Sequence, residues 1–497
     1  MRREETCEVV VIGGGSSALE AAIAARHAGA ASVVMLEKAP ESESGGNAQF
    51  SHTGFRFVHS GKDEVVATFL PDLDAETRRR MRLEAYTPDA FMADLMRVTE
   101  KRIDPVLAQT LVDGSNEAVR WLRDVGVTWE LERAVTVGDD QYYEAGKNIH
   151  PVGGGPGLLR QLRAIALAAG VEIRYEARVM AIHGNDKRVE GVRVSAPDGE
   201  YDLLAPAVIA CSGGFQASAE MRARYLGANT DMFKVRGSKH NTGEVLQLLI
   251  GLGAKTAGHW QGAHMSPIDA QAPAFETPVR PDGRGNAMNR YDYTNGITVN
   301  ARGERFMDEG ESFHSYTYAK TGRAVAAQPD GVAFQLYDEQ GVRLFRHGRD
   351  YPATTFEAPT IAELAQKIGI MPVALEQTIA EFNAACRSDV AFQPGILDGK
   401  STAGIAPPKS NWAVPLDLPP YRALPVTGGV TFSFGGVQID PAGRVLNTGN
   451  QPIRGLFASG DVVGLFFHNY PSCTGQTRNV VFSRSAGRLA AGMLAAS

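Results

Sequence analysis

Cysteine is scarce in this sequence, and its spacing excludes several kinds of site. No two cysteines form a CxxC pair, the arrangement that carries most iron–sulfur clusters and structural zinc sites. The sequence therefore predicts neither a cluster nor any other metal site. We expect reduced thiols, as in a cytoplasmic protein, at all four positions: Cys7, Cys211, Cys386 and Cys473.

Long apolar runs and a basic charge excess are also missing. No segment approaches the roughly 18 apolar residues that cross a bilayer. The amino-terminal stretch MRREETCEVVVIGGG passes from a short polar lead into a buried strand, which is not a signal-peptide pattern. The formal net charge is −6, so nothing points to nucleic acid. These absences predict a cytoplasmic protein without nucleic-acid partners.

Glycine, by contrast, is abundant, and the chain is long enough for more than one domain. There are 54 glycines among 497 residues, with 43% hydrophobic and 21% charged residues, as in globular proteins. A single hydrophobic core stops growing at roughly 250–300 residues. Two domains, or one large domain with an insertion, are therefore predicted.

The segment EVVVIGGGSSALEAAIAARHAGAASVVMLEKAP (8–40) predicts a dinucleotide site. A β-branched strand leads into Gly13, Gly15 and Ala18, which fill the G-x-G-x-x-G/A pattern that seats a pyrophosphate on a helix N-terminus. A helix with small residues on its packing face follows, and a second strand then ends at Glu37. An acid at that place accepts from a ribose 2′-hydroxyl, and it disfavours a 2′-phosphate.

Later segments favour FAD over NAD. A second glycine-rich stretch, SGGNAQFSHTGFR (44–56), comes soon after the first. The segment 205–215 is a strand that ends in a Gly-Gly turn, and 453–464 is a strand that ends at Asp461. Such a return of the chain to the first domain suits a long buried flavin cofactor more than a nicotinamide that comes and goes.

Several further motifs are similar to those of a known family. The sequence resembles the flavoprotein subunits of fumarate reductase and succinate dehydrogenase over essentially its whole length, with 3-ketosteroid dehydrogenases as cousins. Within that family it is most similar to tricarballylate dehydrogenase and to the flavin half of a precorrin-3B synthase. The residues that carry the narrower likeness are 258–269, 296–310, 316–329, 431–440 and HNYPSCTG at 468–475.

The resemblance implies an α/β fold, with a Rossmann-like FAD-binding domain and an inserted α+β capping domain. The cap is expected at 267–410, between the two parts of the FAD-binding domain at 1–266 and 411–497. It begins with a loop rich in proline and glycine. Two short strands around GITVNARGERF and two helices broken at Gly369 and Pro372 are predicted to follow.

The resemblance also implies how FAD is held. Asn47 stands where succinate dehydrogenases carry a flavin-linked histidine, so non-covalent FAD is expected, although His52 remains an alternative attachment point. Val179 resembles the residue whose backbone contacts the adenine. Asp461 is expected to bond the ribityl hydroxyls, and a helix starting near 474–477 to face the flavin pyrimidine. The remaining predicted contacts are Ser17, Lys38, Gly45, Gly46, Ser51, Gly54, Ser212, Gly213, Gly460, Ser472, Thr474 and Gly475.

The same resemblance suggests catalytic residues. His264 falls where fumarate reductases place a substrate-binding histidine, and Glu309 falls in their proton relay. Arg343 falls near their catalytic arginine, and Arg323, in the narrower motif, is a rival for that role. His264 and the two arginines have structural alternatives: the histidine as a structural residue and each arginine as a solvated ion pair.

Two departures weaken a simple fumarate reductase assignment. Thr431 and Phe432 stand where those enzymes carry histidines. His468 is present, but Tyr470 follows where their arginine would lie. Tyr470 matches a ketosteroid dehydrogenase tyrosine that polarises the substrate ketone, so we expect it to contact substrate by hydrogen bonding. Packing under the cap is the structural alternative for Tyr470. His468 is a further candidate catalytic residue, and its alternative is a structural role.

The predicted function is FAD-dependent oxidation of a CH–CH bond next to a carboxylate or carbonyl. The resemblance makes a polycarboxylate similar to tricarballylate the first substrate class, and an iron–sulfur membrane protein the expected electron acceptor, which would hold the chain peripherally at the inner membrane. Three alternatives remain: a ketosteroid-type desaturase of a bulkier ketone, a fumarate-type reductase, and an electron-transfer subunit without substrate chemistry of its own.

Overall fold

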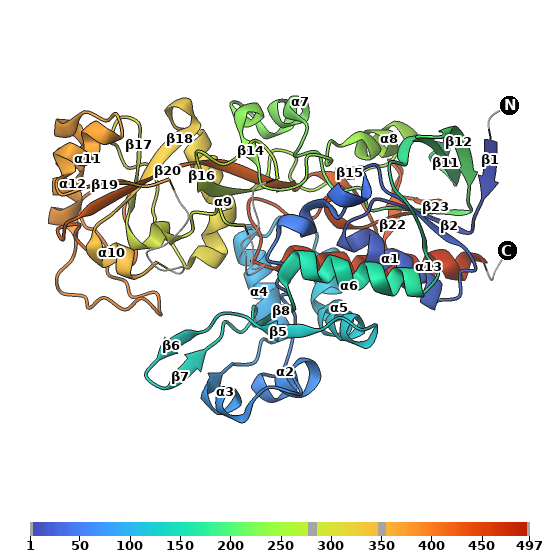
Figure 1. Ribbon diagram of the computed structural model, residues 1–497, viewed down its shortest axis with the longest axis horizontal. Helices are drawn as coiled ribbons and strands as arrows, with labels where there is room; N and C mark the ends of the chain where they lie inside the picture. Colours follow the sequence, from blue (N-terminus) through green and yellow to red (C-terminus); the bar gives the residue numbers. More distant parts are fainter. Residues whose placement is uncertain (1–2, 277–285, 346–353, 495–497) are drawn as a thin grey trace.

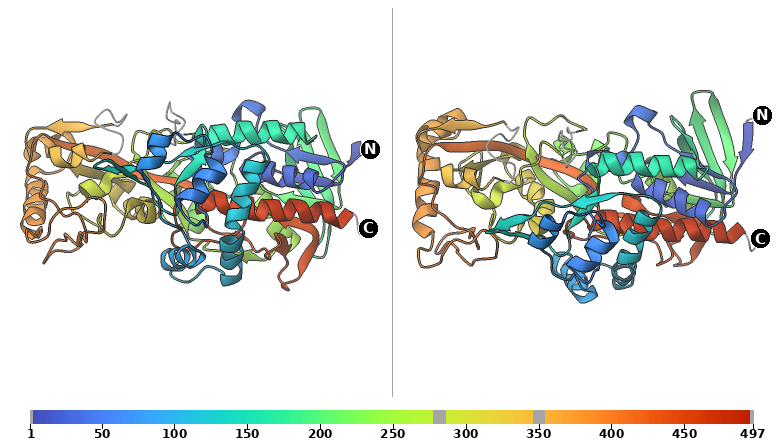
Figure 2. Two further views of the ribbon diagram at one scale, coloured as in Figure 1. Left: turned by 90° about the horizontal axis from the view of Figure 1, so that it is seen from below. Right: turned by 60° about the horizontal axis from the view of Figure 1, so that its bottom comes forward.

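The computed structural model describes residues 3–276, 286–345 and 354–494. The molecule is elongated, with both termini at one end and the predicted cap at the other (Figures 1 and 2). Most of the predicted proline- and glycine-rich loop lies outside the described residues. No helix in the described part of the chain has the length and apolarity needed to cross a bilayer.

A six-stranded sheet forms the centre of the dinucleotide-binding half. Its order is β22-β23-β13-β2-β3-β9, and all neighbours are parallel except β22 and β23. Strands far apart in sequence thus meet in one sheet, and the α/β prediction is confirmed. The strands are β2 (Val9–Ile12), β3 (Val33–Leu36), β9 (Glu172–Arg174), β13 (Ala207–Ala210), β22 (Arg444–Leu446) and β23 (Pro452–Ala458).

Helices and a second sheet cover this centre. Along β2 the side chains alternate between two hydrophobic cores, Val10 and Ile12 on one face and Val9 and Val11 on the other. The covering helices are α1 (Ser16–His27), α6 (Gly154–Ala168) and α13 (Thr474–Leu494). The second sheet contains β1 (Arg3–Thr6), β12 (Gly199–Leu204), β11 (Val189–Ala196) and β10 (Arg178–Gly184) in that order.

A subdomain that the sequence did not reveal is inserted between β3 and α6 and projects below the sheet (Figure 1). Its longest helix, α5 (Pro105–Asp124), begins with Asp104 accepting from the backbone N–H of Val106 and Leu107. The other elements are α2 (Lys62–Phe69), α3 (Ala75–Arg80), α4 (Pro88–Val98), β4 (Met81–Arg82), β5 (Trp129–Leu131), β6 (Val135–Val137), β7 (Asp140–Tyr142) and β8 (Ile149–Pro151).

The cap is built on one long strand, β20 (Tyr421–Ser433), which pairs with four others. Its sheet includes β16 and β20, which extend beyond the predicted limits of 267–410 on both sides. The pairing strands are β14 (Lys234–Val235), β16 (Ala263–Asp269), β18 (Val332–Tyr337) and β19 (Phe356–Ala358), with β17 (Ile297–Asn300) on the far side of β18.

The cap helices complete this unit and enclose a hydrophobic core of their own. The two helices predicted around Gly369 and Pro372 are present, as α11 (Ile361–Lys367) and α12 (Pro372–Ala385). The prediction of two strands around GITVNARGERF was wrong in part: β17 is a strand, but Arg305 forms only an isolated bridge to Val299. The other cap helices are α9 (His314–Ala326) and α10 (Glu339–Arg343).

A connecting segment lies between the two halves. Helix α8 (Glu244–Leu252) starts after Gly243, whose φ of 81° is favourable only for glycine, and it packs beside the second sheet. The remaining short elements are α7 (Ala219–Met221), β15 (Thr256–Ala257) and β21 (Gly436–Val437).

Candidate active site

One cavity of about 1480 Å³ runs from the central sheet to the cap. Residues of the dinucleotide-binding half, the inserted subdomain and the cap all line it. Its volume exceeds the roughly 300–1,000 Å³ of a typical small-molecule site. The cavity therefore has room for a large cofactor and a substrate together.

The glycine turn after β2 shapes the dinucleotide end of the cavity. A Cβ on Gly13, where φ is 122°, would lie 2.4 Å from the carbonyl oxygen of Cys211. A Cβ on Gly14 would lie 2.5 Å from a carboxylate oxygen of Glu37. Only glycine fits at both places. The turn brings the N-terminus of α1 to the cavity wall, where its free N–H groups suit a pyrophosphate.

The acid at the end of β3 lies where the fingerprint requires it. Glu37 is 7% exposed, lines the cavity and accepts a hydrogen bond of 2.7 Å from the N–H of Ala39. Burial raises the pKa of this carboxyl. The neighbouring Lys38 also lines the cavity, and its ammonium lies 2.6 Å from both Thr242 Oγ1 and a carboxylate oxygen of Glu244.

Asn47 is fixed at the cavity wall by three hydrogen bonds. Its amide donates to the carbonyl of Thr431, and its oxygen accepts from the N–H of Ser238 and from Asn241 Nδ2, both at 3.0 Å. These partners come from the end of β20 and from the segment before α8. An amide in this position bridges the cap strand and the dinucleotide-binding half.

Most of the predicted cofactor residues line the cavity, and three do not. Ala18 is buried within α1, Gly460 packs against Ser17, and Thr474 is fully buried at the start of α13. The predicted residues that do line it are Gly13, Gly15, Ser17, Glu37, Lys38, Gly45, Gly46, Asn47, Ser51, Gly54, Val179, Ser212, Gly213, Asp461, Ser472 and Gly475.

Helix α13 begins at Thr474, within the predicted range, and its next residue, Gly475, lines the cavity. Before it, the carbonyl of Ser472 accepts a 2.8 Å hydrogen bond from the fully buried Arg56. Asp461 forms an ion pair with Arg478, whose guanidinium packs 5.7 Å from the ring centre of Phe432. The buried Arg478 therefore orients the carboxylate of Asp461 in the cavity wall.

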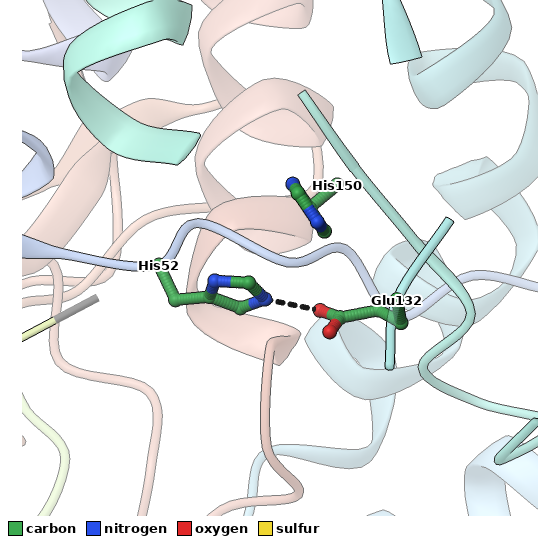
Figure 3. Close-up of side chains that lie close together, drawn as sticks. All are labelled: His52, Glu132 and His150. Atoms are coloured by element: carbon green, nitrogen blue, oxygen red, sulfur yellow. Dashed lines mark hydrogen bonds and ion pairs between the residues drawn. The ribbon is translucent and has the colours of Figure 1, made fainter. Parts of the chain in front are cut away.

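A cluster of two histidines and a glutamate lies in the wall on the side of the inserted subdomain (Figure 3). His52 Nε2 is 2.6 Å from a carboxylate oxygen of Glu132, and the ring centres of His52 and His150 are 4.5 Å apart. Burial opposes ionisation of Glu132, but Lys147, 4.0 Å away, and His52 outweigh it and lower the pKa of the carboxyl. The ammonium of Lys147 thus supplies the counter-charge of this carboxylate.

Tyr470 and Tyr318 form a hydroxyl pair where the cap meets the dinucleotide-binding half. Their oxygen atoms are 2.8 Å apart, and both side chains line the cavity. Burial raises the pKa of Tyr318 to about 12 and that of Tyr470 well above its ordinary value. Both phenols are therefore neutral, so one donates to the other and the second keeps its proton for a ligand.

His264 lies directly behind this pair rather than in the cavity wall. Its ring stacks on Phe432 at 5.4 Å and meets Tyr318 and Tyr470 edge-on. It is fully buried, and neither ring nitrogen has a hydrogen-bond partner among the described residues. Burial holds the pKa of His264 well below its ordinary value, so the ring is neutral. The aromatic contacts make it a support for the two tyrosines.

Arg236, which the sequence did not single out, is the arginine beside these tyrosines. It lines the cavity and donates to Ser266 Oγ at 3.2 Å, to Asn289 Oδ1 at 3.1 Å and to the hydroxyl of Tyr291. Its Nε is buried and has no partner among the described residues. The guanidinium therefore places a positive charge in the cavity wall close to Tyr318 and Tyr470.

The other predicted catalytic residues lie away from the cavity wall. Arg343 lies at the end of α10, 65% exposed, and pairs with Glu339. Arg323 donates to the carbonyls of Leu226 and Gln261. Glu309 is buried and accepts from the N–H of Thr298 at 2.7 Å while it pairs with Arg305, and His468 lies 3.6 Å from Glu100. Each has a structural partner that accounts for its position.

Comparison with known sequences identifies a family and several similar enzymes. The family described as FAD binding domain matches residues 8–476. A probable fumarate reductase of Shewanella frigidimarina is 28% identical over 98% of this chain and 75% of its own length. A 4-oxocyclohexanecarboxylate 2-dehydrogenase of Sinomonas cyclohexanicum is 29% identical over 69% of this chain and 61% of its own length.

Solved structures show the same fold. The open conformation of a flavocytochrome c3 fumarate reductase is 26% identical, with a TM-score of 0.72 over 98% of this chain and 78% of that one. A 3-ketosteroid delta1-dehydrogenase of Sterolibacterium denitrificans is 18% identical, with a TM-score of 0.76 over 98% of this chain and 100% of that one. Both likenesses extend from the dinucleotide-binding half through the cap.

Proposed function

The chain belongs to the FAD binding domain family and is an FAD-dependent oxidoreductase that acts on CH–CH or C=C bonds, and from that premise we propose that its substrate presents a carbonyl or carboxylate oxygen to the Tyr318–Tyr470 pair. The hydrogen bond between these two hydroxyls is the observation that carries the proposal, because it leaves one phenolic proton directed at a ligand.

The residues of the cavity fit FAD. The glycine turn at Gly13 leaves no room for a side chain, Glu37 follows at the ribose position, and Arg478 holds Asp461 in the cavity wall. Bound there, FAD supplies hydride transfer at its ring. We propose that it is bound non-covalently, since Asn47 occupies the position of the linking histidine in the resembled enzymes. The His52 Nε2 contact to Glu132 is consistent with a structural histidine.

The chain's own side chains account for activation of the substrate. A neutral tyrosine that donates to a carbonyl oxygen stabilises the negative charge that develops there when the adjacent carbon loses its proton. Arg236 adds a fixed positive charge beside the same tyrosines. The N-terminus of α9, with no acidic side chain in its first turn, adds a favourable dipole at the cavity wall.

A ketone or a single carboxylate fits the described charges better than a tricarboxylate. Of the lysines and arginines described in the cavity wall, Lys38 and Arg178 pair with Glu244 at the dinucleotide end, and Lys147 lies beside Glu132. A polycarboxylate similar to tricarballylate is the second candidate, because Arg133 of the inserted subdomain also lines the cavity. We propose that a separate protein, of the iron–sulfur membrane type that the resemblance implies, accepts the electrons.

Anaerobic reduction of the bound flavin tests the proposal. The purified holoprotein is mixed with cyclic ketones, keto acids, dicarboxylates and tricarballylate, and the visible flavin absorption is followed. Bleaching by a ketone or keto acid supports the proposed substrate class, and bleaching by tricarballylate alone favours the second candidate. The reverse reaction is tested with photoreduced enzyme and unsaturated acids. Failure of every compound in both directions would favour an electron-transfer subunit without substrate chemistry.

A further inference from the structure

The cavity opens to solvent through a mouth lined by large apolar side chains. Five of the 16 large apolar side chains exposed in the described part of the chain line this one cavity. Exposed apolar residues that gather at one place mark a binding surface, whereas single ones need no explanation. The five are Val135, Tyr142, Leu344, Phe392 and Ile396.

One side of the mouth is the β6–β7 hairpin, which extends beneath the cap (Figures 1 and 2). The strands are antiparallel, with Val135 directly opposite Tyr142. Residues paired in this way project from the same face of a hairpin. Their exposed fractions are 58% and 48%, although burial in a core is the usual place for such side chains. The hairpin therefore turns an apolar face to the cavity.

The other side is a cap segment that is held in place from behind. Trp412 Nε1 donates to the carbonyls of Gln393 and Ile396, at 3.1 and 2.9 Å. The indole packs against Phe313, which also lines the cavity. These contacts fix the backbone of the segment while the side chain of Ile396 stays 51% exposed. The apolar surface is thus a positioned wall.

The mouth is continuous with the proposed reaction site. His314 and Tyr316, at the start of α9, line the cavity together with Tyr318 of the hydroxyl pair. A ligand anchored by its oxygen at Tyr470 and Arg236 therefore has a lined path out between hairpin and cap. A small polycarboxylate would leave the apolar walls in contact with water.

We propose that the mouth between β6–β7 and the cap segment 392–396 binds an apolar alkyl or alicyclic part of the substrate. The inference rests on the proposed function, because it assigns the substrate of the same cavity. It selects substrates in which the activated oxygen and a hydrocarbon group are joined in one molecule. Burial of that group stabilises the complex in proportion to the apolar area removed from water.

Binding of n-alkanoates from propanoate to octanoate tests this subsite without turnover. Affinity for the oxidised holoprotein is measured from the perturbation of the flavin spectrum. We expect the Kd to fall about fourfold for each added methylene once the chain reaches the mouth. Val135→Ser and Ile396→Ser should flatten this dependence. Val373→Ser, which removes an equally exposed valine (64%) from α12 outside the cavity, should leave it unchanged.

A Kd that does not depend on chain length would overturn the inference, as would equal flattening by Val373→Ser. A change in oligomeric state caused by Val135→Ser, with no change in the chain-length dependence, would also overturn it and assign the patch to a protein partner. Since the measurement requires no reduction of flavin, a clear chain-length dependence without bleaching by any substrate would reject the proposed reaction and keep the subsite.

Discussion

The hydroxyl of Tyr470 lies 2.8 Å from that of Tyr318, a residue 152 positions earlier in the chain. Tyr470 belongs to the loop before α13, and Tyr318 belongs to α9 of the cap. The contact therefore exists only when both parts of the protein are assembled. Because burial raises both pKa values, the pair acts through hydrogen bonds between neutral groups.

Removal of either hydroxyl should slow reduction of the flavin without releasing it. For Tyr470→Phe and Tyr318→Phe we expect a loss of about 100- to 1,000-fold in the rate of anaerobic reduction, the usual effect of deleting one donor to a developing oxyanion. Stopped-flow absorbance measures the rate, and the flavin spectrum reports occupancy. Tyr293→Phe is the matched control, because its hydroxyl bonds Thr317 away from the cavity. Equal losses in all three variants would show that the effect is structural.

Substitution of Arg236 should weaken substrate binding more than substitution of the arginines that the sequence favoured. Arg236→Gln removes a charged donor in the cavity wall, and we expect the KM to rise about 10- to 100-fold. Arg343→Gln should have little effect, because this side chain is 65% exposed and paired with Glu339. Steady-state kinetics with an artificial electron acceptor compares the two. A larger effect from Arg343 would reverse the assignment.

Acid precipitation should release the flavin into the supernatant. The expectation follows from Asn47, whose amide already has three hydrogen-bond partners and offers no nucleophile for a covalent link. Flavin fluorescence of the pellet and the supernatant shows whether the flavin is covalently attached. Flavin retained in the pellet of the native protein and released from a His52→Ala variant would instead identify His52 as the attachment point.

Glu20, fully buried in α1, should make stability fall as the pH rises. Burial raises its pKa to about 8, from 4.5, so the folded protein keeps a proton that the unfolded chain releases. Between these values the folded state binds more protons, and the free energy of unfolding should drop by at most about 1.4 kcal/mol per pH unit. Urea unfolding of the holoprotein from pH 5 to 8 measures this slope. Glu20→Gln should reduce it, while Glu376→Gln on the exposed face of α12 should not.

Local patterns predicted the dinucleotide end well. The strand, glycine turn, helix and acid from Val9 to Glu37 are contiguous, so their spacing alone determines the geometry. Tyr470 was predicted to contact substrate from its Tyr-Pro context, and its side chain lines the cavity. These features need no knowledge of how distant segments meet.

The substrate end was less predictable because its residues converge from distant elements. Tyr318 stands in an ordinary helical pattern in which a tyrosine indicates core packing, and Arg236 follows a two-residue strand without a motif. Arg343 was assigned across a segment of loose similarity, where a small shift of alignment moves a side chain to another face of a helix. The strands of the inserted subdomain, of two or three residues each, are too short for their periodicity to be recognised.

Strand β20 connects the cap directly to the wall of the cofactor pocket. It spans 13 residues, pairs with the strands of the cap along most of its length, and ends with Thr431 and Phe432 in the cavity wall. The Asn47 amide ties that end to the dinucleotide-binding half. A tilt of the cap would move the end of β20 and, through the hydrogen bond from Asn47 to Thr431, the wall of the cofactor pocket. The position of the cap and the shape of the cofactor pocket are therefore linked through this one strand.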